Sequence, residues 1–531
     1  MRINTRCGTC RVRKVRCDSS RPVCKRCVST GRVCEGYGVW GGGNNPFGHQ
    51  PPMTREPLPI NSGLLTSDEQ KYAEWFVCNT AGRMSGAFAS TFWHRLVLQA
   101  NFHEPAVLHA TVALAAAEKR SFLILDPFPK AEPKLDDEER FILRQYNKAI
   151  KHARPLFSRR DKASVRVLLM DCMIFTCLEF IRGRHKAGYT HLSNGLRLLD
   201  QIATTEGSYE DSWLHEVFFT LNTHSALFQH SIPCRYVQHL PPPLTSPPPI
   251  RYESIPQARQ HLDRLLSATH HLTAQHLRHE DNRPLTDLLL CQRRICEELH
   301  AWKASYNILK ARVFGAVAQV ARRDNKALRF LSVHHTLANI LSETCLRGED
   351  ESVFDRHTHL FGTLVRQVFG LIEFVSPDTP AYIGCDRYHF SADMGFIPPL
   401  FFTALKCRAL RVRMRAVKLL RILGHQEGIW DATLVAAVAE EVIRYEDERA
   451  QNGLLMDAYD FPLAGDPPQI VIPERLRVQQ INITLPDEPM GNVMVVYGRR
   501  QDDGSWGSFR REFVCVSGKG YVAVQASGTR R

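Results

Sequence analysis

Long apolar runs are scarce in this 531-residue chain. Even the longest apolar stretches, such as Ala432–Ala439, fall well short of the roughly 20 residues that a membrane-spanning helix requires. Residues 1–6 also lack the apolar segment of a secretion signal, so we expect that nothing exports the chain. The sequence therefore predicts a protein without a membrane partner.

Catalytic motifs are scarce as well. The sequence contains neither the G-x-S-x-G of serine hydrolases nor a phosphate-binding P-loop, and the glycine-rich Ser517–Gly520 has no hydroxyl residue after its lysine. Histidines are plentiful, but His270, His271 and His276 do not form the zinc-protease pattern H-E-x-x-H. We therefore predict that the protein is not an enzyme.

Cysteines are concentrated at the start of the chain, in the pattern C-x2-C-x6-C-x6-C-x2-C-x6-C. The six residues are Cys7, Cys10, Cys17, Cys24, Cys27 and Cys34. Thiolates favour tetrahedral zinc, whereas a disulfide framework, the alternative, belongs to secreted proteins. Six sulfurs can give two ions four ligands each only if two of them bridge. We expect two structural Zn2+ ions, because protein sulfurs fill every ligand position, and reduced, mostly buried thiols at the other ten cysteines.

Positive charge is concentrated in the same segment. Residues 1–40 hold ten lysines and arginines against Asp18 and Glu35, and two zinc ions with six thiolates reduce the surplus only to about +6. We expect a short helix after Cys10 to carry four basic residues and a second helix to open with two more; they are Arg11, Arg13, Lys14, Arg16, Lys25 and Arg26. Such a helix can enter the major groove of double-stranded DNA. The alternative is that the basic residues form only a solvated face, or that the zinc cluster only stabilises the fold.

The cysteine spacing and the run Arg11–Asp18 resemble the fungal Zn2Cys6 binuclear-cluster transcription factors. The resemblance implies that Cys7 and Cys24 are the bridging ligands. It implies that the positions of Arg13 and Lys14 face the bases, typically of a CGG-like triplet, and that Arg11 and Arg16 lie nearer the phosphates. Arg13 stands where the family commonly has lysine. The implied function is sequence-specific regulation of RNA polymerase II transcription in the nucleus.

The rest of the chain predicts a mainly α fold. We expect a zinc-cluster domain over residues 1–36, a flexible glycine- and proline-rich linker over 37–66, an all-helical, solenoid-like regulatory domain over 67–480 and a C-terminal β-hairpin segment over 481–531. Thr66 and Glu69 form a capping box that predicts the first helix of the large domain. No heptad repeat follows the linker, which leaves a monomer or a homodimer formed elsewhere as alternatives.

Helical periodicity recurs through the large domain, and two stretches, Phe92–Ala117 and Gly395–Arg408, resemble the fungal regulatory middle homology region. Further helices are expected at Glu139–Ala153, Val165–Arg182, Lys186–Ile202, His215–His230, Ala258–Arg278 and Leu285–Lys310. Near the end, Asn492–Arg499 and Trp506–Val516 alternate like the strands of a hairpin around Asp503–Gly504.

A basic stripe follows Cys407 on an amphipathic helix, and its members are Arg408, Arg411, Arg415 and Lys418. We interpret it as a solvated or internally paired face rather than a site for DNA phosphate, calmodulin or a membrane. The competing hypothesis for the whole chain is an interaction protein. Its helical domain would bind co-regulators or a small effector, and its zinc cluster would give only non-specific attraction to DNA.

Overall fold

The fold comes from a computed structural model of the full chain. It describes residues 7, 9–10, 13–18, 20, 24–32, 34, 65–88, 90–124, 135–159, 161–206, 212–228, 251–278, 284–316, 322–347, 350–375, 390–450, 472–486, 488, 491–501, 503–516 and 520–524. Apart from residues 65 and 66, the predicted linker lies outside the described residues.

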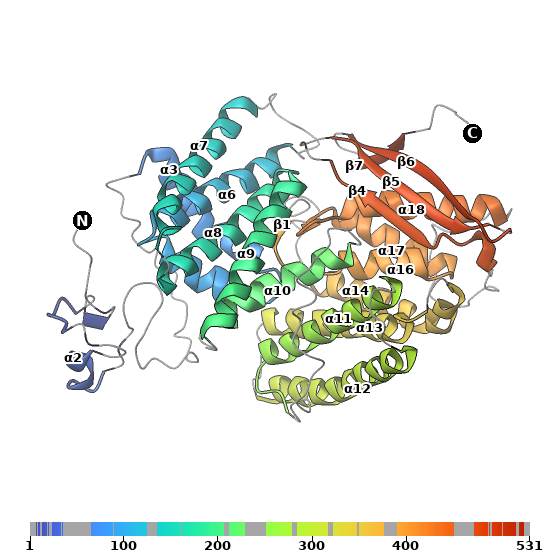
Figure 1. The fold of residues 1–531 in the computed structure, drawn as a ribbon, viewed down its shortest axis with the longest axis horizontal. Coiled ribbons are helices and arrows are strands. Elements are labelled where there is room, and N and C mark those ends of the chain that lie inside the picture. Colours follow the sequence, from blue (N-terminus) through green and yellow to red (C-terminus); the bar gives the residue numbers. More distant parts are fainter. Residues whose placement is uncertain are drawn as a thin grey trace. The chain divides into compact units, whose positions relative to one another are not determined.

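The chain is mainly helical, as predicted (Figure 1). The helices of the first half, with short 3-10 or π turns labelled η, are α2 (Lys25–Val28), α3 (Ser67–Trp75), η2 (Phe76–Thr80), α4 (Ala81–Met84), η3 (Phe92–Leu96), α5 (Val97–Ala100), α6 (Pro105–Ile124), α7 (Leu135–Ala153), η4 (Arg154–Leu156), α8 (Lys162–Ile181), α9 (His185–Glu206) and α10 (Ser212–Leu227). Those of the second half are α11 (Ile255–Arg278), α12 (Leu285–Ala316), α13 (Arg322–Thr344), η7 (Ser352–His357), α14 (Thr358–Val375), α16 (Ile397–Lys406), α17 (Leu410–Leu423), α18 (Ala432–Ala450) and η9 (Glu474–Leu476). Among the described residues, no helix is both long and apolar enough to span a membrane.

Two compact units divide the chain. The first comprises residues 1–82, 90–117 and 134–175, and the second comprises residues 83–89, 118–133 and 176–531. In the first unit, Thr66 caps α3 with the predicted capping box: Glu69 N–H donates to the Thr66 hydroxyl, and Thr66 N–H donates to the Glu69 carboxylate 3.0 Å away. Lys148 on α7 also binds that carboxylate. The end of the linker is therefore held by both α3 and α7.

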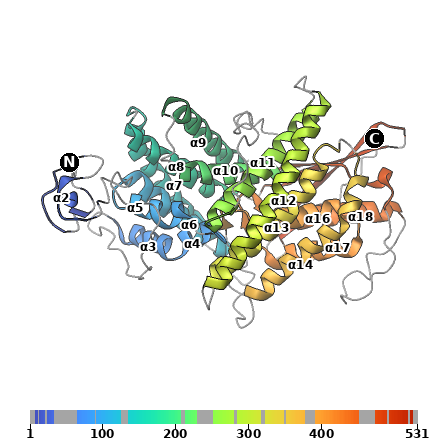
Figure 2. The same cartoon turned by 90° about the horizontal axis from the view of Figure 1, so that it is seen from below.

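The helices of the second unit pack both on the next helix in the chain and on the one after it. Helices α11, α12 and α13 pack against one another, α14 packs on α13, and α16 packs on α17 and α18 (Figures 1 and 2). The apolar face predicted for the helix after Cys407 is buried in α17 at Ala416, Leu419, Leu420 and Leu423. The buried apolar faces of neighbouring helices form the core of this unit.

A four-stranded antiparallel sheet follows the helices of the second unit. Its strands are β4 (Gln480–Thr484), β5 (Val493–Arg500), β6 (Trp506–Val516) and β7 (Gly520–Val524), paired in that order. The predicted hairpin is confirmed as β5 and β6, whose register places Arg500 opposite Trp506. Two further strands extend the hairpin, and β7 packs on α18. A small second sheet joins β1 (Phe390–Ser391), β2 (Gln426–Glu427) and β3 (Trp430–Asp431).

The basic stripe near α17 begins with a buried, paired arginine. Arg408 contacts the carboxylates of Glu351 at 3.0 Å and Glu446 at 3.2 Å, and all three side chains are buried. Arg413, one turn into α17 and fully buried, also binds Glu446 at 2.6 Å. Buried charges persist only when they are paired in this way. For Arg408, the internally paired interpretation is therefore confirmed.

Candidate functional site

The six cysteine sulfurs predicted from the spacing lie in one cluster. Two groups of four sulfurs each have all their atoms within 4.8 Å of one another, and the groups share Cys7 and Cys24. Cys10 and Cys17 complete the first group. Cys27 and Cys34 complete the second. Each group therefore offers one ion four sulfurs, two of which it has in common with the other group.

The sulfur spacing fits tetrahedral zinc. At a zinc–sulfur bond of about 2.3 Å, two ligands of one tetrahedral ion lie about 3.8 Å apart. The Sγ atoms of Cys7 and Cys24 are 3.6 Å apart, those of Cys10 and Cys24 are 3.7 Å apart, and those of Cys7 and Cys27 are 3.8 Å apart. Cys10 and Cys27 lie 3.8 Å apart across the two groups, so the six sulfurs form one compact set.

Backbone N–H groups support the sulfurs in the same way in both halves. Cys10 N–H donates to Cys7 Sγ at 3.3 Å, and seventeen residues later Cys27 N–H donates to Cys24 Sγ at 3.3 Å. Cys24 is also the N-cap residue of α2. These donors favour the thiolate form, the form that binds a metal.

Burial opposes that form when no metal is bound. It raises the pKa of the Cys7 thiol and raises that of Cys24 to about 12. A coordinated ion reverses the effect, because its positive charge removes the thiol proton. The cluster therefore suits a cation that binds soft sulfur ligands, and zinc is the ion whose geometry the sulfurs match.

The structure describes five of the six basic residues predicted for nucleic-acid contact, and four of them are exposed. Arg11 lies outside the described residues. Lys14 and Arg16 are exposed, as are Lys25 and Arg26 on α2. The predicted helix after Cys10 does not include Arg13, Lys14 and Arg16: Arg13 and Lys14 form a turn, and Arg16 lies beyond it in non-helical chain. Arg16 therefore does not share a helical face with the residues before the turn.

Lys14 has an unusual backbone conformation. Its φ is 53°, in the left-handed region that disfavours side chains, and Gly31 holds the equivalent place in the second half with a φ of 59°. Val15 N–H donates to the carbonyl of Cys10, and Arg32 N–H donates to that of Cys27, both at 3.0 Å. These bonds are the helix-ending bonds of a Schellman motif, whose left-handed residue is usually glycine. Lysine there costs roughly 1–2 kcal/mol.

Arg13 turns toward the second half of the cluster. Its guanidinium Nη1 donates to the hydroxyl oxygen of Thr30 at 3.3 Å. The Thr30 hydroxyl in turn donates to the carbonyl oxygen of Arg26, 2.9 Å away on α2. Arg13 and Thr30 are equivalent positions of the two halves, seventeen residues apart. A Thr30 contact with Arg13 was not foreseen from the sequence, which gives threonine no particular role at that place.

Asp18 joins the two halves from the connecting segment. Its carboxylate accepts hydrogen bonds from the N–H groups of Lys25 and Arg26, each at 3.0 Å, and from the Ser20 hydroxyl. The Ser20 hydrogen bond and the two backbone donors lower the pKa of Asp18. The charged carboxylate therefore holds the start of α2. The sequence signal was an acid ahead of a helix whose first residues are both basic.

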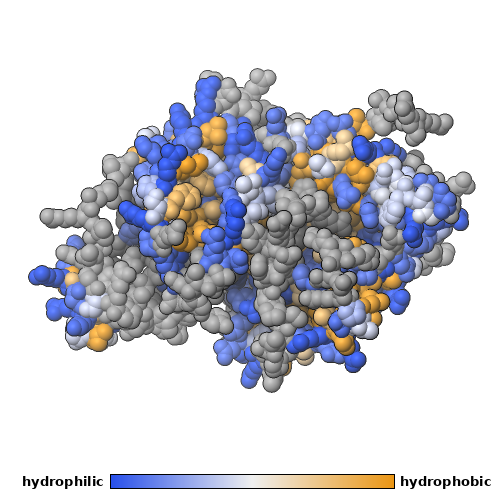
Figure 3. Space-filling view, in the orientation of Figure 1, coloured by the Kyte–Doolittle hydropathy of each residue, from blue (hydrophilic) through white to orange (hydrophobic). Residues whose placement is uncertain are grey.

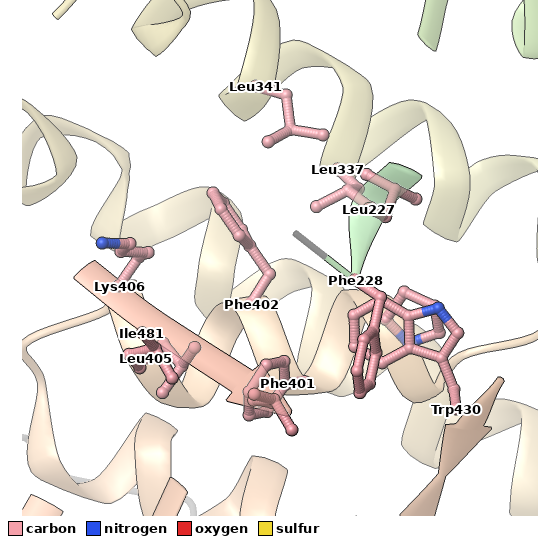
Figure 4. Close-up of a pocket in the computed structure, with 12 residues that line it drawn as sticks. Leu227, Phe228, Leu337, Leu341, Phe401, Phe402, Leu405, Lys406, Trp430 and Ile481 are labelled. Carbon is pink, nitrogen blue, oxygen red and sulfur yellow. The ribbon is translucent and has the colours of Figure 1, made fainter. Parts of the chain in front are cut away.

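The helical body also contains a cavity of about 50 Å³. Figure 4 shows the aromatic side chains of Phe228, Phe401 and Trp430 around it. Lys406 lies at one end, but its ammonium is held by the Glu351 carboxylate 2.7 Å away, and burial lowers its pKa to about 8. Ligand pockets usually have a volume of about 300–1,000 Å³. This cavity is too small for an effector of that kind.

Comparisons with known proteins match two segments of the chain. Residues 5–39 match the fungal Zn(2)-Cys(6) binuclear cluster domain, and residues 74–442 match the fungal specific transcription factor domain. No solved structure matches the chain.

Several curated transcription regulators are similar to parts of it. The aspercryptin biosynthesis cluster-specific transcription regulator atnN of Emericella nidulans is 30% identical over 221 residues, which cover 37% of this chain and 34% of that protein. Transcription regulator lscL of Purpureocillium lilacinum is 24% identical over 216 residues, 36% of this chain and 48% of that protein. Transcriptional regulatory protein moc3 of Schizosaccharomyces pombe is 50% identical over 36 residues, 7% of each chain. The chain thus spans less than half the length of these relatives.

The two domain matches and the cysteine geometry lead to the same conclusion. The match to the fungal specific transcription factor domain covers more than half of the chain, and the sulfur cluster lies inside the match to the binuclear cluster domain. The chain belongs to the fungal-specific transcription factors that carry a zinc-binding Zn2Cys6 domain.

Proposed function

We propose that this protein is a nuclear, sequence-specific DNA-binding regulator of RNA polymerase II transcription. Its zinc module would read a CGG-like triplet in the major groove of double-stranded DNA. The observation that carries the proposal is the left-handed, exposed Lys14, at a position where the second half of the module has glycine. Residues held in strained conformations cluster at functional sites. Lysine at this place supplies a side chain that the fold itself does not need.

We assign two zinc ions to the module. Cys7 and Cys24 bridge the ions, and the remaining four cysteines each bind one. The two groups of sulfurs that share Cys7 and Cys24 support this assignment. With no ligand position left open for water, the metal acts on structure rather than in catalysis. The number of ions can be checked by native mass spectrometry, which should find two zinc ions for each chain.

We assign two kinds of DNA contact to the basic residues. Lys14 and Arg13 read the bases, because both lie in the turn that follows Cys10, and Lys or Arg donates to guanine O6 and N7. Arg11, Arg16, Lys25 and Arg26 contact phosphates and set the position of the module on the duplex. The N–H groups of Lys25 and Arg26 are already bound by Asp18, which orients α2 for those contacts.

Titrations of the full zinc-loaded chain test these roles. One duplex contains the CGG triplet, and the other has the same composition in scrambled order. We expect Lys14→Ala to weaken binding to the triplet duplex by about 1–3 kcal/mol and to leave the scrambled duplex nearly unchanged. Arg16→Ala should weaken binding to both duplexes alike. It should also reduce the slope of the logarithm of the binding constant against the logarithm of the salt concentration by about 1.

A matched control is Lys151→Ala, an exposed lysine on α7 that we expect to leave both titrations unchanged. The assignment of roles fails if Lys14→Ala and Arg16→Ala have the same effect on the two duplexes. Binding that shows no preference for the triplet at any salt concentration would instead favour the interaction-protein hypothesis, in which the module only attracts polyanions.

A further inference from the structure

Beyond the buried Arg408, the basic stripe of α17 reaches solvent. Arg411, Arg415 and Lys418 lie at the spacing i, i+4, i+7, which places their side chains on one side of the helix. Ile422 continues the same line one turn later and is 47% exposed. Arg411 and Lys418 are exposed, and Arg415 is half-buried. These four residues, three cations and one isoleucine, form the basic face of α17.

The neighbouring helix adds an exposed aromatic ring. Phe369 on α14 is 49% exposed, and α14 packs beside α17 in both ribbon views (Figures 1 and 2). In the lower right of Figure 3, where Figure 1 places α13 and α14, hydrophobic side chains lie among hydrophilic ones. The two helices therefore offer cations and apolar groups together, the combination that recognises an acidic peptide with apolar side chains.

The other two arginines of α17 each bind a carboxylate of α18. Arg413 contacts Glu446 at 2.6 Å, and Arg421 contacts Glu440 at 2.6 Å. Because the earlier arginine binds the later glutamate, the two helices are antiparallel, and α18 ends beside the start of α17, where Arg411 lies. α17 contains no acidic residue of its own. The basic face therefore adds three positive charges beyond these two ion pairs.

The chain leaves α18 beside the basic face and returns to the same place. Residues 451–471 follow α18 and lie outside the described residues. Beyond them, Val478 N–H donates to the carboxylate of Glu446 at 2.8 Å, and that carboxylate also binds Arg413 at the start of α17. Both ends of the segment are therefore held near the beginning of the basic face.

This segment has the opposite charge to the basic face. Its residues 454–466 include Asp457, Asp460 and Asp466, with leucine, methionine and aromatic residues between them. Residues 451–471 contain no lysine or arginine. Three negative charges interleaved with apolar side chains are complementary to three positive charges beside Ile422 and Phe369.

The segment is also long enough to lie along the whole basic face. A loop of 21 residues whose ends are held together can extend outward by about 35 Å. The helix from Arg411 to Ile422 is only about 16 Å long. Exposed ion pairs are individually weak, but a tethered segment acts at an effective concentration on the order of millimolar. A modest affinity is therefore sufficient for docking.

We propose that the basic face of α17 is a docking site for residues 454–466 of the same chain. The aspartates of the segment pair with the three cations, and its apolar side chains cover Ile422 and Phe369. The docked segment neutralises the basic face, so DNA phosphates are attracted to the zinc module rather than to α17. The docking does not depend on DNA, and only its consequence for DNA rests on the proposed function.

A peptide added in trans tests the docking. The peptide comprises residues 452–468 with an uncharged dye, and its binding to the full zinc-loaded chain is followed by fluorescence anisotropy. Wild type should bind it weakly, because its own segment occupies the basic face. The triple variant Asp457→Asn, Asp460→Asn, Asp466→Asn should bind the peptide at least about ten-fold more tightly, because the tethered competitor is weakened. Equal affinity in the two proteins would overturn the proposal.

Substitutions in the basic face locate the peptide. Arg411→Ala and Lys418→Ala, added together to the triple variant, should return its peptide affinity to the level of wild type. Arg510→Ala is the matched control, since it removes an exposed arginine of β6 in the same unit and should leave the gain intact. Circular dichroism should show the helical content of wild type in every variant. A gain that persists without the two cations of α17 would place the peptide elsewhere and overturn the proposal.

Titration with the scrambled duplex tests the consequence for DNA. The triple variant should bind this duplex about five-fold more tightly than wild type, because three cations become available to phosphates. Arg411→Ala with Lys418→Ala should remove that gain, yet leave the duplex affinity of the wild-type background unchanged. A loss in the wild-type background would mean that DNA, rather than the segment, occupies the basic face, which overturns the proposal. Triplet preference should be the same in all of these variants, so a failure of triplet reading is distinguishable from a failure of docking.

Discussion

The two halves of the zinc module have the same supporting hydrogen bonds but differ at the residue that ends each helix. Cys10 and Cys27 donate to the equivalent sulfurs, and their carbonyls accept the equivalent helix-ending bonds. In the second half the left-handed residue is Gly31, and in the first half it is Lys14. One half therefore follows the stereochemical preference of the backbone, and the other departs from it.

In the proposed function, this difference separates a structural half from a DNA-reading half. Gly31 needs no side chain, and a Cβ added there would meet nothing within 4 Å. Lys14 has a similar φ of 53° but carries a cation into solvent. Because the metal supplies most of the stability of such a small module, a local strain of roughly 1–2 kcal/mol is tolerated. In the proposed function, the strain is retained at the residue whose side chain contacts DNA.

The largest expected effect comes from removing one sulfur from either half. Cys17→Ser and Cys34→Ser each take one unshared ligand from a group of four. Metal binding contributes on the order of 10 kcal/mol to the folding of such modules, so both variants should lose zinc and specific DNA binding together. Zinc content and DNA titration of the full chain measure the outcome.

The control for this pair is Cys78→Ser, which changes an exposed cysteine of the helical body and should leave both readouts unchanged. If either Cys17→Ser or Cys34→Ser still holds two zinc ions and binds the triplet, the shared-ligand arrangement is wrong. If only one of them fails, the two halves are not equivalent in metal binding.

Lys14→Gly should separate stability from function. Glycine relieves the left-handed strain, so the module should resist a zinc chelator better, by about 1 kcal/mol or roughly five-fold in chelator concentration. The same variant should lose the preference for the triplet duplex. Chelator competition and DNA titration of the full chain check the two effects. A Lys14→Gly protein that keeps its triplet preference contradicts the base-reading role.

Gly31→Lys is the reciprocal change in the second half. It should lower resistance to the chelator by about 1 kcal/mol, since the new side chain has space but the φ of 59° remains unfavourable. Triplet preference should be unchanged, because the proposed function assigns base reading to the first half. A new sequence preference in Gly31→Lys would show that both halves lie against the DNA bases.

The smallest effect is expected at Thr30, through which the second half contacts the first. Thr30→Val removes the hydroxyl that accepts from Arg13, and a hydrogen bond of this kind contributes about 0.5–1.5 kcal/mol. Affinity for the triplet duplex should fall by a few-fold with no change in zinc content. Thr30→Ser keeps the hydroxyl and should behave like wild type. Equal losses in both variants would mean that Arg13 does not depend on this contact.

The features of the fold and the site that depend on nearby residues could be predicted from the sequence. Ligand spacing is a local property, so the six cysteines predicted a cluster with shared ligands, and Thr66 and Glu69 predicted the start of α3. Helical periodicity predicted α7–α12 within a few residues at most ends. The left-handed Lys14 could not be read from lysine itself; its only signal is Gly31, seventeen residues later.

Contacts between distant residues explain what the sequence did not predict. Burial of Arg413 requires Glu446, and burial of Lys406 requires Glu351, partners 33 and 55 residues away. Strand β4 is short and pairs only through β5, so alternation over five residues gave too weak a signal. Side-chain pairing in the tertiary fold, rather than local pattern, decides these features.

The most direct test of the account is a selection from random duplex DNA with the full zinc-loaded chain, carried out for wild type and Lys14→Gly at two salt concentrations. We expect wild type to enrich a CGG-like triplet at both concentrations, because base contacts persist when phosphate attraction is screened. Lys14→Gly should bind zinc yet enrich no triplet. Enrichment that is the same in both proteins, or absent from wild type at the higher salt concentration, would contradict base reading by Lys14.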